Sequence, residues 1–207
     1  MSAPLNDMNP SQMDLTLEFR FANGSSSEFY ATDEAQVRES LRLLAAPRLF
    51  AQPHLLLASP HMASMIPCKG IDMILAHTTG PLPVKFPLDF ATAQFDAVEQ
   101  PIAWLDEDSA AMEEEPARHG QPRRHSSQVE IHTLGGWAVT LDTVAVFRGL
   151  VQDERQFFSH LPELPTIPFR LEEGGFGLIN TLNILRVTAC PKPETLAGIA
   201  LPLTLRQ

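Results

Sequence analysis

The hydrophobic and polar positions near the start of the chain alternate in the pattern of a half-buried strand. Apolar and polar side chains follow each other one by one along LTLEFRF, residues 15–21. A strand places successive side chains on opposite faces, so this alternation predicts one buried and one open face. The next residues include Asn23 and Gly24, which tolerate a positive φ, and we therefore expect a hairpin there.

The period then changes to that of a helix in TDEAQVRESLRLLAAP, residues 32–47. Asp33 followed by Gln36 is the spacing of a capping box at a helix start. Val37, Leu41 and Leu44 form an apolar stripe with helical spacing, which predicts one buried face. The helix should end before the proline that closes this stretch, because the residue before a proline disfavours helical geometry.

Three short apolar runs follow, each interrupted by proline or glycine. Their composition and length predict strands, and the interruptions predict the breaks between them. The runs are HLLLAS (residues 54–59), HMASMI (61–66) and IDMILAHT (71–78), broken at Pro60, Pro67 and Gly70.

The second half of the chain opens with a similar pattern. QVEIHTLGGWAVTL (residues 128–141) predicts two strands joined by a turn at Gly135 and Gly136. QDERQFFSHL (152–161) predicts a short amphipathic helix stopped by a proline. Two further strands are expected at IPFRL (167–171) and FGLINTLNILRVTA (176–189), with the tail GIALPLTLRQ (198–207) as a final edge strand.

Together these elements predict an α+β fold with a largely antiparallel sheet and two short helices. Both halves run hairpin, helix, hairpin, with Leu17 to Val129 offset by 112 residues and Met73 to Ile184 by 111. Two interpretations stay open: two ββαββ-like pseudo-repeats, or unrelated stretches of one domain. We expect a first α+β half at 13–80, an acidic, partly mobile connector at 81–127 and a second α+β half at 128–207. The alignment places Asp72 over Asn183.

The net charge of −10 is concentrated in one segment. Between Asp89 and Glu115 the chain has nine acidic residues and no Lys or Arg, and a short basic stretch, RHGQPRRH, follows it. Such a charge balance disfavours nucleic-acid binding, because phosphate backbones attract basic surfaces. It favours a basic protein surface as a partner. The alternative interpretation is a solvated loop that keeps the protein soluble.

Other compositional features indicate the cellular setting. Cys68 and Cys190 are the two cysteines in 207 residues, too few for a disulfide framework, which favours free thiols in a reducing compartment. The N-terminus has no basic region followed by an apolar run, so we expect no signal peptide. No apolar stretch reaches the ~20 residues that span a bilayer. These features predict a cytoplasmic protein without a membrane segment.

Motifs of known chemistry are absent from the sequence. It contains no phosphate-binding glycine loop, no nucleophile elbow and no clustered metal-ligand motif. The adjacent Lys69 would favour a thiolate at Cys68, but neighbouring strand side chains point to opposite faces. His54, His61 and Cys68 are seven residues apart, a spacing that only turns could bring to one zinc ion. We therefore expect no cofactor and no metal.

Two acidic residues interrupt apolar strands, Asp72 and Glu130. We interpret both as polar residues on the open face of a strand.

Three functional hypotheses follow. The first is a non-enzymatic cytoplasmic protein-binding or assembly module whose acidic connector engages a basic partner. The second is a hydrolase-like enzyme with a site between the halves, with His61, Cys68, Asp72 and His132 as candidate catalytic residues. The third is a sensor with a small-ligand pocket between sheet and helix. If the halves are repeated, their exposed sheet edges could pair with each other or with a second chain, and the second case predicts a homodimer.

Overall fold

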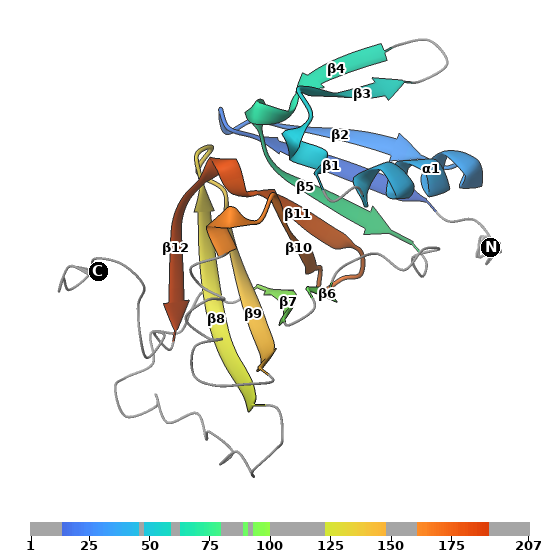
Figure 1. Ribbon diagram of the computed structural model, residues 1–207. Coiled ribbons are helices and arrows are strands. Elements are labelled where there is room, and N and C mark those ends of the chain that lie inside the picture. The colour runs from blue at the N-terminus through green and yellow to red at the C-terminus, as the bar shows by residue number, and fades with distance from the viewer. Residues whose placement is uncertain are drawn as a thin grey trace, which may run out of the picture.

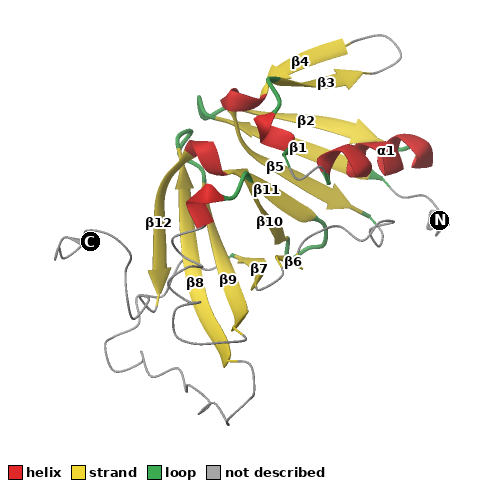
Figure 2. Cartoon of the chain, in the orientation of Figure 1, coloured by secondary structure: helices red, strands yellow, loops and turns green. Residues whose placement is uncertain are grey.

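The computed structural model describes residues 14–45, 48–58, 63–79, 89–90, 93–99, 123–147 and 161–190. In these ranges the chain is a mixed α/β fold with a large, mostly antiparallel sheet and few helices (Figures 1 and 2). The strand order of the main sheet is β12-β8-β9-β7-β10-β11-β5-β1-β2, with β6 paired to β7. The predicted α+β class with a largely antiparallel sheet is confirmed at this level.

The first part of the sheet has β1 (Leu15–Phe21) at its centre. β1 pairs antiparallel with β2 (Ser26–Ala31) on one side and with β5 (Ile71–Thr78) on the other. The alternation predicted for β1 is confirmed, because Leu15, Leu17 and Phe19 are buried. The hairpin turn between β1 and β2 includes Gly24 at φ +81°, a left-handed conformation that favours glycine.

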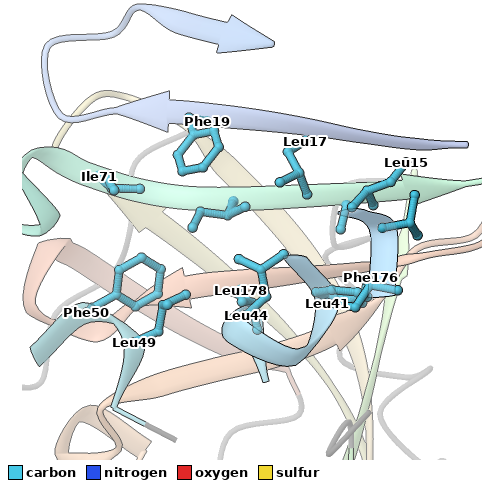
Figure 3. Close-up of a cluster of buried hydrophobic side chains, with 13 residues drawn as sticks. Leu15, Leu17, Phe19, Leu41, Leu44, Leu49, Phe50, Ile71, Phe176 and Leu178 are labelled. Atoms are coloured by element: carbon cyan, nitrogen blue, oxygen red, sulfur yellow. The ribbon is translucent and has the colours of Figure 1, made fainter. Parts of the chain in front are cut away.

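The one α-helix of the described residues, α1 (Glu34–Leu44), begins as the sequence predicts. The side chain of Asp33 accepts a hydrogen bond from the backbone N–H of Gln36 at 3.0 Å, which satisfies a free donor of the first turn. Val37, Leu41 and Leu44 are buried. They pack with side chains of β1, β5 and β11 in the first hydrophobic core (Figure 3).

A two-stranded sheet follows α1 and stands apart from the main sheet. β3 (His54–Ala58) and β4 (Ala63–Pro67) form an antiparallel hairpin that extends away at one end of the molecule (Figure 1). Leu55, Leu57 and Ile66 on its inner face pack against the first core. A 3-10 turn, Cys68–Gly70, then leads directly into β5.

The second part of the sheet is centred on β8 (Arg123–Thr133). It pairs with β9 (Ala138–Phe147) and with β12 (Ile184–Cys190), both antiparallel.

Three strands connect the two parts, and a short fourth strand pairs with one of them. β6 (Asp89–Phe90) and β7 (Ala93–Val98) come from the segment predicted as a connector, and β7 lies between β9 and β10 (Thr166–Arg170). β10 forms a hairpin with β11 (Phe176–Asn180), and β11 pairs with β5. The main sheet is therefore continuous from β12 to β2.

The prediction of one continuous strand over 176–189 is wrong. A 3-10 turn, Thr181–Asn183, divides it into β11 and β12. The side chain of Asn180 accepts from the N–H of Leu182 at 3.2 Å, and such local bonds compete with strand pairing.

The second predicted helix and the predicted tail strand lie outside the described residues, except for Leu161. That residue begins a 3-10 turn, Leu161–Glu163.

β5 and β11 contribute to both hydrophobic cores. On β5, Ile74 belongs to the first core, whereas Met73 and Leu75 belong to the second. On β11, Leu178 packs in the first core and Ile179 in the second. Because successive side chains point to opposite faces, this strand pair is the shared wall between the cores.

We expect Gly177→Ala to destabilise the fold by about 1–3 kcal/mol through overpacking. Gly177 lies opposite Phe169 in the β10–β11 pair, and a Cβ there would overlap the Phe169 ring. Urea unfolding measures the change. Gly70→Ala is the matched control, since its Cβ would meet no atom within 4 Å, and it should shift stability by less than about 0.5 kcal/mol. Equal effects of the two changes would contradict this packing argument.

Candidate functional site

A network of buried polar groups joins the two parts of the molecule where the turn Cys68–Gly70 meets β11. The Asn180 amide donates to the carbonyl oxygens of Cys68 at 3.2 Å and Ile71 at 2.8 Å. The Asn183 amide donates to those of Lys69 and Ile71, both at 3.0 Å. Buried amides need such partners, so these bonds fix the start of β5 against the second half.

Asp72 belongs to the same junction. Its side chain is fully buried, and its Oδ2 accepts from the backbone N–H of Gly135 at 2.7 Å. The expectation that Asp72 lies on the open face of a strand is therefore wrong. The β8–β9 turn approaches so closely that a Cβ at position 135 would overlap the carbonyl oxygen of Phe21. Asp72 holds this turn in place.

Trp137 completes the junction from the other side. Its indole N–H donates to the carbonyl oxygen of Phe21 at 3.0 Å. The guanidinium of Arg20 lies 5.0 Å from the centre of the indole ring, a cation–π contact. Arg20 also pairs with Glu18 at 2.8 Å. The hairpin β1–β2 and the hairpin β8–β9 thus meet through directional contacts.

Cys68 is placed for packing rather than for reaction. It is fully buried, and its Sγ lies 3.8 Å from the carbonyl oxygen of Leu49. Burial raises the pKa of the Cys68 thiol, because an apolar environment disfavours the charged form. The thiolate is the nucleophilic form, so this environment lowers the reactivity of Cys68.

His132 lies on the β8–β12 pair, with Glu130 and Arg186 around its ring. Nε2 is 2.8 Å from Nη2 of Arg186 and 3.1 Å from Oε2 of Glu130. A guanidinium only donates, so the neutral ring accepts from Arg186, and the protonated ring donates to Glu130. Glu130 is half-buried in this contact.

The four candidate catalytic residues have different surroundings. His61 lies outside the described residues. Cys68 and Asp72 are buried within the junction, and His132 contacts two charged side chains in the second part of the main sheet. Within the described ranges no three His, Cys, Asp or Glu side chains group to hold a metal ion.

A groove of about 310 Å³ lies between the two parts, on the other side of the shared strand wall from α1. Its apolar residues include Met73, Leu75, Val139 and Phe169. Three exposed glutamates, Glu99, Glu172 and Glu173, also line it. The remaining lining residues are Arg20, His77, Ala97, Val98, Ala138 and Leu171.

Sequence reasoning missed the groove residues and both junction asparagines. The sequence signal at Asn180 and Asn183 is weak: two asparagines inside an apolar run. Their partners lie more than 100 residues earlier in the chain. Trp137 follows a predicted Gly-Gly turn, but nothing local indicates that it reaches Phe21.

We expect Cys68 to react with a thiol reagent such as DTNB on the order of a hundredfold more slowly than Cys190, since burial protects it and raises its pKa. Stopped-flow kinetics at pH 7 to 9 measure this. The variant Cys190→Ser should show only the slow phase, which becomes fast in denaturant. A fast phase from native Cys68 would contradict its buried placement.

We expect the junction asparagines to be energetically coupled. Asn180→Ala or Asn183→Ala should each cost about 1–3 kcal/mol of unfolding free energy, because buried carbonyl oxygens lose their donors. Both amides donate to the Ile71 oxygen, so the double variant should lose more than the two single losses together. A double-mutant cycle in urea measures the coupling, and strict additivity would contradict it.

Comparison with known proteins adds no assignment. No protein-family model, no curated protein and no solved structure matches this chain. In the described part of the chain no helix is long and apolar enough to span a membrane.

Proposed function

We propose that this protein is a non-enzymatic, cytoplasmic protein-binding and assembly module. Its groove takes a partner segment that carries an apolar side chain flanked by basic residues. The observation that carries this proposal is the combination, in one groove, of an apolar surface with three exposed glutamates. Apolar contact supplies affinity in such sites, and complementary charge supplies specificity and faster association.

The charge distribution of the sequence supports the same partner class. Glu99 lines the groove, and the acids of Asp106–Glu115 begin seven residues later. A basic partner would meet negative charge at the groove, and the segment that follows Glu99 in the sequence carries further acidic residues.

The roles of the candidate catalytic residues favour a binding function over hydrolysis. Cys68, Asp72 and His132 do not line the groove. Asp72 is engaged with Gly135, and burial disfavours the thiolate of Cys68. The groove lies among β1, β5, β7, β9 and β10, rather than between sheet and helix as the sensor hypothesis expects. The two free cysteines support a reducing compartment.

The proposal includes an internal duplication, in which each half is one copy of the same unit. Two observations on strand pairing support it. Leu17 faces Ala76 across β1–β5, and Val129 faces Ala189 across β8–β12. Each pair of strands has one register shift near its end, at Asp72 in the first half and at Leu185 in the second.

The hairpins and turns support the duplication as well. His54 faces Pro67 in β3–β4, and Thr166 faces Asn180 in β10–β11. Each hairpin leads through a three-residue 3-10 turn into the last strand of its half. The N–H of Ala22 donates to the turn carbonyl of Gly70, and that of Leu134 donates to Asn183.

These correspondences revise the alignment made from the sequence. They keep the offset of 112 between Leu17 and Val129. They pair Ile71, rather than Met73, with Ile184, and Asp72 with Leu185. The shift arises in the loop of the second hairpin, residues 171–175, which is one residue longer than the loop 59–62. Residues identical in this alignment are Glu18/Glu130, Gly24/Gly136, Leu49/Leu161, Pro53/Pro165, Ile66/Ile179, Ile71/Ile184 and Ala76/Ala189.

We expect the purified protein to bind peptides in which one Leu or Phe is flanked by Lys and Arg, and not the same peptides with Glu in place of the basic residues. Reversing two charges of the groove, Glu172→Lys with Glu173→Lys, should weaken binding about tenfold. Fluorescence anisotropy at two salt concentrations measures affinity, which should fall as salt rises.

The matched control is Glu34→Lys with Glu39→Lys on α1, which changes the net charge equally but lies outside the groove lining. It should leave the affinity within about twofold, because exposed charges far from the peptide are screened. Deleting Asp106–Glu115 tests the connector separately, and an unchanged affinity would remove it from the proposal. Binding that both double variants reduce equally would point to net charge alone and overturn the groove assignment.

A further inference from the structure

The duplication leaves one strand contact between the two halves unmatched. In this chain β11 of the second half pairs with β5 of the first. The counterparts of these two strands are β4 and β12. In the described part of the chain, β4 pairs only with β3, and β12 pairs only with β8 at the end of the main sheet. Among the described residues the equivalent contact, β4 against β12, is therefore unmade, and each of these two strands has one edge without a strand partner.

Side chains of β3 and β4 are more exposed than their counterparts on β10 and β11, as a missing contact predicts. Leu178 on β11 is 2% exposed, whereas its counterpart Met65 on β4 is 64% exposed. Pro168 on β10 is buried, whereas its counterpart Leu56 on β3 is 68% exposed. The outer face of the β3–β4 hairpin is apolar at these positions, and in the second hairpin Leu178 packs in the core of the first half.

The same contrast holds for the last strand of each half. The first six residues of β5 are all buried. In β12 Leu185 and Arg186 are exposed, and the other five residues are only half-buried. Leu134 and Leu182 are also exposed near the start of β12, where the N–H of Leu134 donates to Asn183. An apolar surface therefore lies beside the free edge of β12.

The two free edges are separated within one molecule. Figure 1 shows the β3–β4 hairpin at one end and β12 at the opposite side, with β1, β5 and β8 between them. The inner face of the hairpin packs on the first core, and the turn Cys68–Gly70 ties β4 directly to β5. A second copy of the chain can supply the missing strand without any change in this arrangement.

We propose that the protein assembles with itself head to tail, with β4 of one copy adding as an antiparallel strand to β12 of the next. The inference rests on the duplication in the proposed function. The register follows from β11 and β5, where Phe176 faces Ala76 and Leu178 faces Ile74. It places Ala63 opposite Ala189 and Met65 opposite Val187 of the other copy.

The contact joins two different strands, so an open row of copies leaves a β4 and a β12 edge unpaired at its ends, whereas a closed assembly does not. Main-chain hydrogen bonds along the added strand supply affinity, and the apolar faces supply specificity. A ring in which every copy donates its β4 and accepts the β4 of another copy pairs the edges of β4 and β12 in every copy, and a two-membered ring is the smallest. The homodimer predicted from the sequence is this case.

Directed disulfide formation tests the pairing. Met65→Cys and Val187→Cys are made in separate, differently sized tagged chains, each with Cys190→Ser, while buried Cys68 stays in place. Opposed strand residues have Cβ atoms close enough for a disulfide. We expect oxidation of the mixed chains to give a covalent heterodimer on a non-reducing gel, and each chain alone to give none.

The register control replaces Met65→Cys by Ser64→Cys. Neighbouring residues of a strand point to opposite faces, so the thiol at position 64 faces away from that at position 187. It should crosslink at least about tenfold less with the Val187→Cys chain. Equal crosslinking by both variants, or no crosslink at all, would overturn the proposed register. If one chain carrying both cysteines crosslinks only within itself, the second copy is excluded.

A second measurement tests the assembly without new cysteines. Met65→Lys places a charge on the exposed hairpin face, so the monomer should fold normally while its dissociation constant in light scattering rises at least about tenfold. Tyr30→Lys on β2, equally exposed, should leave self-association unchanged. If both variants assemble like the wild type, the inference fails. Peptide binding in the groove, measured on the same samples, shows separately whether the proposed function holds.

Discussion

The pairing of β5 with β11 is the contact on which the rest of the structure depends. It makes one continuous sheet from two groups of strands, and it forms the wall between the two cores. Residues that alternate along β5 contribute to opposite cores, so a shift of one residue would exchange both sets of side chains at once. Burial on both faces of the strand pair therefore specifies its register. The groove on one side and α1 on the other both take their positions from it.

The polar junction fixes the distance and orientation between the two halves, which the apolar cores alone do not define. Hydrophobic burial is non-directional, whereas the bonds from Asn180 and Asn183 to the turn before β5 define both distance and angle. The bond from Gly135 to Asp72 does the same for the β8–β9 hairpin. Unpaired groups at these positions would cost free energy, so alternative arrangements of the two halves are disfavoured. Asp72 and Cys68, which are candidate catalytic residues in the sequence, thus have structural partners in the fold.

Features set by short stretches of sequence were predictable. The helix α1 with its Asp33 cap and the strand alternation of β1 depend on neighbours within a few residues. The contacts of Asn180 and Trp137 join residues more than 100 positions apart. No periodic pattern within a short stretch of sequence indicates such contacts. Asp72 was misassigned because a carboxylate on a strand is usually exposed, and its partner is a turn of the other half. The groove was not predictable because it is lined from five strands that are far apart in sequence.

The distance along the chain between β5 and β11 also has a consequence for biosynthesis. Ala76 and its partner Phe176 are 100 residues apart. At about 5–20 residues per second, a ribosome needs roughly 5–20 s to make the intervening chain. During that time the first core lacks Phe176 and Leu178, and the edge of β5 that β11 later occupies is open. A nascent chain therefore carries an unpaired strand edge, a feature that favours aggregation, until β11 has been synthesised.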